Sequence, residues 1–198
     1  MTKDNYEIQP FEMKNIPLIL DVVVPMWSPP AEDIAFRRFY VENIVRSNCF
    51  ENDFRFQLVA PDFSSMAFFA RKNDICKAED WFQSESKRFT EEKLRSSQMG
   101  KVYIELMDQK TRAFMNDDDI QLTLYVSRKK GCGSKLLDDL CGRLKSQGFK
   151  NLYLWTDCEC DWQWYTKHGY ELISSEVYKP FSSKDEDYLT YIFCKKLI

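Results

Sequence analysis

The stretch "RKKGCGSKLLDDL", residues 128–140, joins a basic triplet and two closely spaced glycines to leucines at helical spacing. Residues 120–126 before it alternate apolar and polar side chains, which predicts a strand with one apolar face. The apolar residues after the glycines form one stripe of a helix that we expect to end in a left-handed cap at Gly148. Residues 152–156 predict another strand, so the region forms a βαβ unit whose two strands lie parallel and adjacent.

The segments on either side of this unit predict further helices and antiparallel strands. Apolar residues at helical spacing predict helices over residues 14–27 and about 30–46, the second beginning at the prolines Pro29 and Pro30. Short apolar runs bounded by turn residues predict strands at 6–11, 55–60, 66–72, 169–178 and 187–197. The sheet is therefore predicted to be mixed.

Residues 77–116 interrupt the strands with a long polar segment. It contains one glycine and no proline, and its aromatic and aliphatic residues recur at helical spacing from Trp81 to Met107. We expect one or two helices here, inserted between strands.

Length and charge restrict the class of protein. A chain of 198 residues with 44% hydrophobic residues is long enough for one compact domain with a substantial core. Its formal charge of -3 provides no overall field that would attract nucleic acid or an anionic membrane. No apolar run approaches the roughly 18 residues of a membrane span, and the first ten residues contain no apolar signal segment. We therefore expect a cytoplasmic protein with no nucleic-acid or membrane partner.

The cysteines predict neither disulfides nor a metal site. There are seven of them, an odd number, without paired CxxC spacing. Cys158 and Cys160 could join His168 as ligands, but a CxC pair with the chain's single histidine is a poor zinc pattern.

The glycine junction has the features of an anion site. Backbone N–H groups at a helix N-terminus are unpaired, and the helix dipole favours a negative charge there. Gly131 and Gly133 let the main chain approach a phosphate closely, the three basic residues 128–130 add charge, and Ser134 adds a hydroxyl. The alternative is a solvated basic turn that caps a helix. Two known phosphate loops do not fit, because the dinucleotide motif needs a glycine at Leu136 and the P-loop needs a longer spacer.

A third phosphate loop does fit. "RKKGCG" matches the Arg/Gln-x-x-Gly-x-Gly/Ala signature of the general N-acetyltransferase (GNAT) superfamily, between a strand and a helix as in that family. The segment "LWTDCECDWQWYTKHGYELI", residues 154–173, resembles the family's second motif, with Trp164-Tyr165 standing before Gly169-Tyr170. The resemblance covers residues 119–178 and the order of elements over 6–72, whereas 77–116 replaces what is usually a short hairpin.

The resemblance implies a fold class and a cofactor. The fold would be α/β (α+β), GNAT-like, with a mixed, mostly antiparallel sheet, a central parallel βαβ pair and helices on both faces, in one domain spanning 1–198. The co-substrate would be acetyl-CoA, its pyrophosphate over the amides of residues 130–134 and its pantetheine along the edge of residues 124–126. The turn after Val126 is shorter than usual, so the resemblance does not by itself predict the family's bulge, which opens a cleft between the parallel strands. The implied cofactor-binding residues are Leu124, Tyr125, Val126, Arg128, Lys129, Lys130, Gly131, Cys132, Gly133, Ser134 and Asp161.

The implied reaction is direct transfer of acetyl from acetyl-CoA to a primary amine. Tyr165 stands where the family has a general acid for the departing thiolate, and its alternative role is core packing. Asp119 is the candidate general base, with a solvated turn at residues 117–119 as the alternative. His168, the only histidine, is expected in a turn, so no Ser-His-Asp or Cys-His arrangement competes.

The acceptor is left open between a small-molecule amine and a protein amine. Trp27, Trp81 and the acidic residues 185–187 could line a site for a cationic amine, or serve as core packing and surface. Two other hypotheses remain: a catalytically inactive CoA-sensing or interaction module, for which the 77–116 insertion would be a docking surface, and a general nucleotide-binding protein. A homodimer is also possible.

Overall fold

One mixed sheet organises the molecule, in a computed structural model that describes residues 6–30 and 32–197. The described strands follow the order β1-β2-β3-β4-β5-β7-β6. Only β4 and β5 pair in parallel, which confirms the predicted βαβ unit and the mostly antiparallel sheet. The strands are β1 Glu7–Pro10, β2 Arg55–Val59, β3 Phe63–Arg71, β4 Ile120–Ser127, β5 Asn151–Asp157, β6 Glu171–Val177 and β7 Leu189–Lys196.

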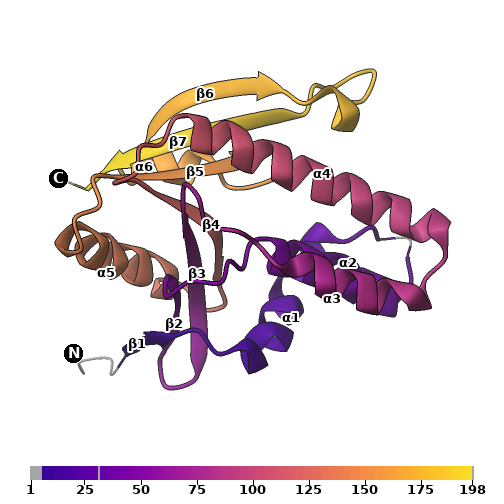
Figure 1. Cartoon of the computed structure of the whole chain (residues 1–198), viewed down its shortest axis with the longest axis horizontal. Coiled ribbons are helices and arrows are strands. Elements are labelled where there is room, and N and C mark those ends of the chain that lie inside the picture. The colour runs from indigo at the N-terminus through magenta and orange to yellow at the C-terminus, as the bar shows by residue number, and fades with distance from the viewer. Residues whose placement is uncertain (1–5, 31, 198) are drawn as a thin grey trace.

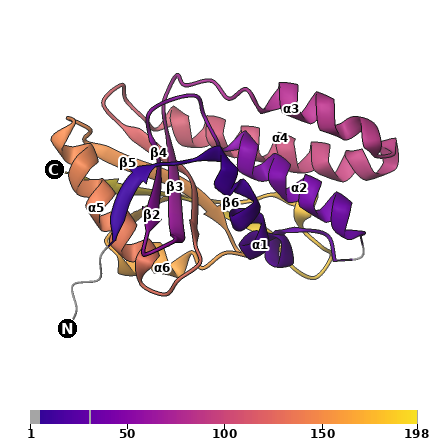
Figure 2. The same ribbon diagram turned by 90° about the horizontal axis from the view of Figure 1, so that it is seen from below.

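Helices cover both faces of the sheet, as predicted. Figure 1 shows α5 on one side of strands β2 to β4, and α1, α2 and α3 on the other. Seen from below in Figure 2, α2 lies alongside α3 and α4. The helices are α1 Ile16–Trp27, α2 Ile34–Ser47, α3 Ala78–Glu85, α4 Glu91–Ala113, α5 Cys132–Ser146 and α6 Gln163–Lys167, with short 3-10 turns at Met13–Asn15, Ser86–Arg88 and Lys179–Phe181.

Each face of the sheet has its own core, because alternate residues of β3 and β4 point to opposite sides. Leu136 and Leu140 of α5 pack in one buried cluster with Phe69. On the opposite face, Val23 of α1 and Phe68 belong to a second cluster, with α2. Both faces of β3 are thus buried, which places the central strands at fixed positions between the two helical layers.

Local chemistry determines where two of the helices begin and end. The backbone φ of Gly148 is +93°, so the predicted left-handed cap after α5 is confirmed. The predicted start of α2 at Pro30 is wrong, because the helix begins at Ile34. The side chain of Asp33 accepts a hydrogen bond from the N–H of Phe36 at 3.0 Å, which makes Asp33 the N-cap.

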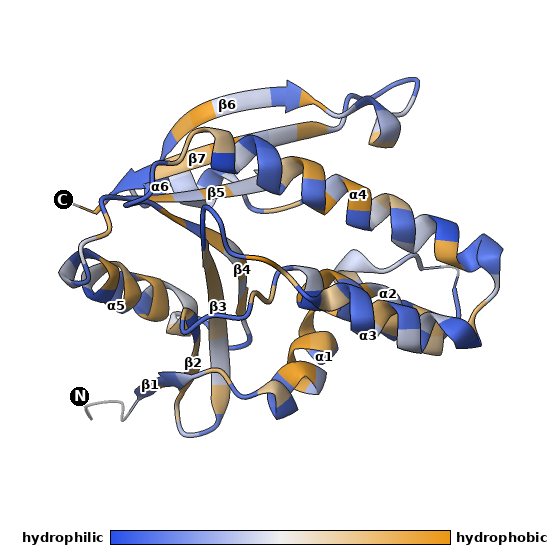
Figure 3. Cartoon of the chain, viewed as in Figure 1, coloured by the Kyte–Doolittle hydropathy of each residue, from blue (hydrophilic) through white to orange (hydrophobic). Residues whose placement is uncertain are grey.

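The segment 77–116 forms two helices, α3 and α4, where one or two had been predicted. Glu91 and Glu92 occupy the first turn of α4, and Lys110 and Arg112 the last, an arrangement that complements the helix dipole. Figure 3 shows apolar and polar residues alternating along this helix. Its apolar stripe, which includes the buried Ile104, faces the rest of the molecule.

The sheet divides between β4 and β5. Phe68 and Phe69 of β3 pair with Leu124 and Leu122 of β4, so Thr123 is an extra residue that forms a bulge. Its hydroxyl donates to the carbonyl oxygen of Asn48 at 2.7 Å. Beyond this point β4 stays with β3 and β5 stays with β7, as Figure 1 shows. The structure thus contains a bulge in β4, which the short turn after Val126 had not allowed us to predict.

Parallel pairing between β4 and β5 ends early as a result. It joins Ile120 to Leu152 and Gln121 to Tyr153, and continues no further along either strand. From Leu122 onward, the edge of β4 that faces β5 therefore has no strand partner among the described residues. This unpaired edge borders the cavity that opens between the two strands.

We predict that Asp108 makes folding stability depend on pH. The residue is 8% exposed, and burial raises the pKa of its carboxyl. The folded protein thus holds this proton more tightly than the unfolded chain, and the stability linked to it is lost as pH rises through the folded-state value. In the wild-type protein, Gln121 Nε2 and Trp155 Nε1 donate to one oxygen of the Asp108 carboxyl, at 2.7 and 2.8 Å. The amide oxygen of Asp108→Asn can still accept both hydrogen bonds.

Urea unfolding at pH 5 and pH 8 tests this prediction. From pH 5 to pH 8, wild type should lose stability that Asp108→Asn keeps, so the free energy of unfolding of the variant minus that of wild type should increase. An equal difference at both pH values would show that Asp108 is ionised to the same extent in both states.

Candidate active site

A cavity of about 470 Å³ lies where β4 and β5 diverge. Strand residues from both sides form its walls, namely Leu122 to Tyr125 of β4 and Leu154 to Asp157 of β5. Helices α1, α2, α4 and α6, the residue that follows α2, the turn between β5 and α6, and the segment between β6 and β7 complete it. The lining residues from these parts are Trp27, Tyr40, Ile44, Asn48, Gly100, Tyr103, Ile104, Glu159, Cys160, Tyr165, Phe181 and Tyr188.

The N-terminus of α5 lies beside this cavity. Gly131, with a φ of +82°, caps the helix, and the first helical hydrogen bond runs from the N–H of Lys135 to the carbonyl of Gly131. Gly133 is packed so closely that an added Cβ would come within 1.8 Å of the hydroxyl oxygen of Tyr125, a cavity residue. Both glycines are therefore required by geometry, one for its φ and the other for its close contact.

The basic triplet has divided roles. The ammonium of Lys129 donates to the carbonyl of Ala60 at 2.8 Å and pairs with Asp62, so it holds the turn between β2 and β3. Arg128 and Lys130 are exposed, and the structure gives neither of them an ion pair with another described residue. These two cations, with the amides of the helix N-terminus and the half-buried Ser134, can receive an anion.

Tyr165 lies in the wall of the cavity. It belongs to the short helix α6, and its ring packs against Tyr170 and Phe193 at centroid distances of 5.4 and 5.7 Å. Burial, with smaller contributions from Cys160 and Tyr125, raises the pKa of its hydroxyl. The phenol therefore stays protonated at neutral pH and can donate a proton to a base stronger than itself.

The two acidic residues among the predicted site residues do not reach the cavity. Asp119 is fully buried at the start of β4, where its carboxylate accepts from the N–H of Asn116 at 2.8 Å and from Asn151 Nδ2 at 2.7 Å. This carboxylate joins a turn to β5 and lies outside the cavity lining. Asp161 is exposed just before α6 and is also outside the lining.

Two carboxylates that the sequence reasoning missed line the cavity instead. Asp157 ends β5 and is 9% exposed, and it accepts hydrogen bonds at 3.2 Å from the hydroxyl of Tyr103 and from the N–H of Glu159. Burial and the nearby Asp157 raise the pKa of Glu159. The sequence does contain a signal for them, because Asp157 and Glu159 follow the strand predicted at residues 152–156 and lie within the second motif.

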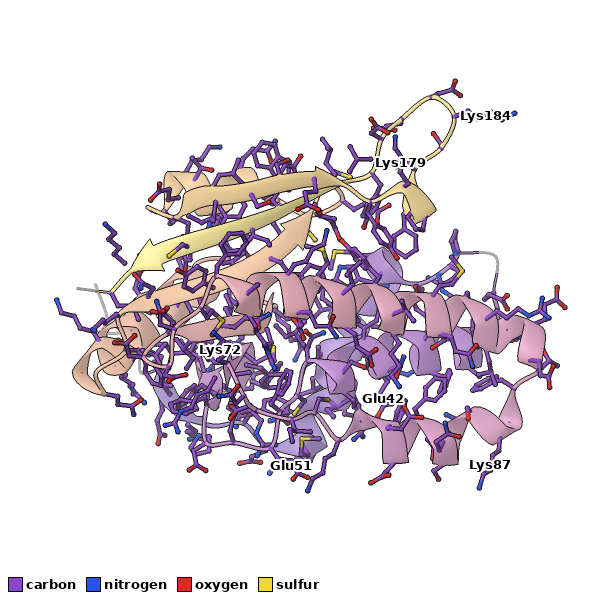
Figure 4. All side chains as sticks on the ribbon, turned by 45° about the horizontal axis from the view of Figure 1, so that its top comes forward. Glu42, Glu51, Lys72, Lys87, Lys179 and Lys184 are labelled. Carbon is purple, nitrogen blue, oxygen red and sulfur yellow. The ribbon has the colours of Figure 1, made fainter. Side chains whose placement is uncertain are left out.

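Aromatic side chains make up much of the remaining wall. Trp27, one of the proposed amine-site residues, lines the cavity, whereas Trp81 stacks on Phe39 in a separate cluster. The acidic residues 185–187 do not line it, and Asp187 pairs with Lys179 at 2.7 Å. Figure 4 shows Lys184 at the tip of the same loop, pointing away from the body of the protein.

The described residues show neither a metal site nor a membrane span. No described helix has the length and apolar character needed to cross a membrane. In the same part of the chain, no cluster of three or more His, Cys, Asp or Glu side chains could hold a metal ion. All seven cysteines are free thiols.

Comparison with known proteins identifies the fold. No family model and no curated protein matches the sequence. Among solved structures, the ribosomal-protein-S18-alanine N-acetyltransferase from Escherichia coli aligns over 98% of this chain and 94% of its own, with a TM-score of 0.53 and 12% identity. Arylalkylamine N-acetyltransferase 2 from Aedes aegypti aligns over 98% and 100% (TM-score 0.53, 11% identity), and a polyamine N-acetyltransferase from Drosophila melanogaster over 97% and 100% (0.51, 11%).

The chain therefore has the fold of these N-acetyltransferases, which confirms the GNAT-like fold that its two motifs implied. At these identities the likeness establishes the architecture, and the chemistry has to be argued from the cavity itself.

Proposed function

We propose that the protein is an acyl-CoA-dependent N-acyltransferase that moves acetyl from acetyl-CoA directly to a primary amine. The observation that carries this proposal is the cavity at the divergence of β4 and β5, with a helix N-terminus beside it and Tyr165 in its wall. The named structures with this fold are, by their titles, acetyltransferases of a ribosomal protein, an arylalkylamine and a polyamine, which supports the same class of reaction.

The residues around the junction fit acyl-CoA. Pantetheine is a peptide-like chain, and the unpaired edge of β4 at residues 124–126 offers main-chain groups that can pair with it as a strand would. The amides of residues 130–134 would hold the pyrophosphate, with Arg128 and Lys130 adding charge. Lys129 is engaged by Asp62, so we assign it a supporting role in that loop.

The reaction needs a neutral amine and a protonated leaving group. A carboxylate, Glu159 or Asp157, would accept the proton that the ammonium loses, in place of the proposed Asp119. The amine nitrogen then attacks the thioester carbonyl, and as the carbon–sulfur bond breaks the proton of Tyr165 passes to the departing sulfur. The proton that the acylated nitrogen sheds returns to the Tyr165 phenolate, which leaves a neutral amide, a thiol and a protonated tyrosine. The raised pKa of Glu159 brings this carboxyl closer to the pH at which a base is most effective.

Turnover of acetyl-CoA with a panel of primary amines tests the proposal. Release of the CoA thiol, matched by an increase of one acetyl mass in an amine, is the expected result. CoA binding without turnover of any amine or protein N-terminus would instead support the inactive CoA-binding module.

We predict that Gly100→Leu weakens amine use without affecting the cofactor. Gly100 lies in the middle of α4 in the cavity wall, and a Cβ there would already sit 3.3 Å from the hydroxyl oxygen of Tyr40. The added isobutyl group would fill space on the α4 side, so KM for the amine should rise about tenfold. The affinity for acetyl-CoA should stay within about twofold, since the helix N-terminus and β4 are unchanged.

A matched control is Gly142→Leu, on α5, where an added Cβ meets no atom within 4 Å. Equal kinetic effects of the two variants would mean that α4 does not contact the acceptor.

A further inference from the structure

We propose that the α4 side of the cavity selects a small primary ammonium compound with an aromatic body and no carboxylate. This inference rests on the proposed function, because it names the acceptor for the same cavity. The charges and the aromatic rings of the lining residues carry it.

The charge of the lining is entirely acidic. Asp157 and Glu159 are the only carboxyl side chains among the described lining residues, and no Lys, Arg or His is present there. A carboxylate on the acceptor would therefore meet two like charges and no cation, at a cost that an ammonium group does not incur. Free amino acids are thus disfavoured relative to the amines that lack their carboxyl group.

The two carboxylates form one cation site. The N–H of Glu159 donates to Asp157 at 3.2 Å, so the two acidic residues are adjacent, and the hydroxyl of Tyr103 donates to the other oxygen of Asp157. Tyr40 of α2 lines the same cavity, and burial and then Glu159 raise the pKa of its hydroxyl, so it stays a neutral phenol. An ammonium group entering here would relieve the repulsion between the two acids and find hydroxyl oxygens as further acceptors.

The remaining wall is aromatic. Tyr103 contacts Trp155 at a centroid distance of 5.4 Å and Phe181 at 5.0 Å, and Tyr188 lies 6.0 Å from it. Trp27 supplies another ring from α1. These rings offer stacking and edge contacts to an aromatic body and cation–π contacts to its ammonium group. Apart from Asp157 and Glu159, the lining residues that the structure describes offer no acidic side chain to the second ammonium of a diamine.

Calorimetric titration of the CoA-loaded protein with three matched probes tests the inference. Tyramine carries the ammonium and the ring, tyrosine adds the carboxylate, and tyrosol replaces the ammonium by a hydroxyl. We expect tyramine to bind at least tenfold more tightly than either of the others, and more tightly than the diamine cadaverine. Equal binding of tyrosine or tyrosol, tighter binding of cadaverine, or no binding of tyramine would each overturn the proposal.

Glu159→Gln tests the charge directly. The side chain is exposed, so the variant should fold, and tyramine should bind about tenfold more weakly while tyrosol is unaffected. The matched control is Glu171→Gln on β6, at an exposed residue outside the cavity lining. It should change neither the affinity for tyramine nor the affinity for tyrosol. Equal affinities of Glu159→Gln and wild type for tyramine would overturn the proposed cation site.

These experiments test the selectivity of the acceptor site and the acyltransferase function separately. Selective tyramine binding without acetylation would uphold the acceptor site and refute the acyltransferase function. Acetylation of amino acids in preference to their amines would uphold the function and refute the selectivity.

Discussion

Replacing Tyr165 by phenylalanine should lower kcat about 10²- to 10⁴-fold, the range typical of a lost general acid. The hydroxyl that would protonate the departing CoA thiolate is removed, while the ring and its packing against Tyr170 and Phe193 are kept. Affinity for acetyl-CoA should therefore change little. The measurement is steady-state CoA release with the best amine of the panel, beside calorimetric titration of acetyl-CoA.

The control for this variant is the same change five residues later. Tyr170 packs edge-on against Tyr165, but its hydroxyl is outside the cavity lining. Tyr170→Phe should keep kcat within about threefold of wild type. A Tyr165→Phe enzyme as active as Tyr170→Phe would remove Tyr165 from the mechanism.

The double variant Arg128→Glu/Lys130→Glu should weaken acetyl-CoA binding about 100-fold. Both side chains are exposed beside the N-terminus of α5, so reversing them replaces two charge-assisted contacts to phosphate by repulsion. The loss should diminish in high salt, because exposed charges are screened. Isothermal calorimetry at low and high ionic strength measures both effects.

A control of equal charge change is Lys87→Glu/Lys196→Glu, two exposed lysines outside the junction and the cavity. It should bind acetyl-CoA as wild type does, and equal losses in both double variants would indicate a non-specific charge effect. Gly133→Glu is a less clean probe, since its Cβ alone would overlap Tyr125 and approach Ser127 Cβ to 2.9 Å. That variant would disturb β4 together with the phosphate site.

The arrangement of strands and helices was largely predictable from the sequence, because each element has a clear periodicity. The leucine stripe of residues 136–144 and the alternation in 120–126 correspond to α5 and β4 in the structure. The division of the sheet at Thr123 was not predictable in this way, since a bulge shifts pairing without changing the pattern of apolar residues.

The acidic residues show why the site itself was harder to predict. Asp119 and Asp157 both flank predicted strands, but Asp119 directly precedes β4 and Asp157 is the last residue of β5. Because the two parallel strands pair at their beginnings and diverge later, only the later end faces the cavity. The structure therefore places Asp119 at the end of the central pair that lies away from the cavity.

The insertion at 77–116 illustrates a similar limit. Its helices were predicted from spacing, whereas their role depends on which face of α4 meets the sheet. Gly100, Tyr103 and Ile104 line the cavity, so we propose that this helix shapes the acceptor site. An interaction surface on its other side would use different residues of the same segment.

The most direct test of the central claim is calorimetric titration of acetyl-CoA into the wild-type protein, with ADP as the comparison. The cavity at the β4–β5 divergence predicts binding on the order of micromolar, and at least tenfold weaker binding of ADP, because only acetyl-CoA has a pantetheine arm to lie along β4. Equal affinity for the two would indicate a general nucleotide site. No binding of acetyl-CoA to the folded protein would contradict the account and leave the glycine junction as a charged helix cap.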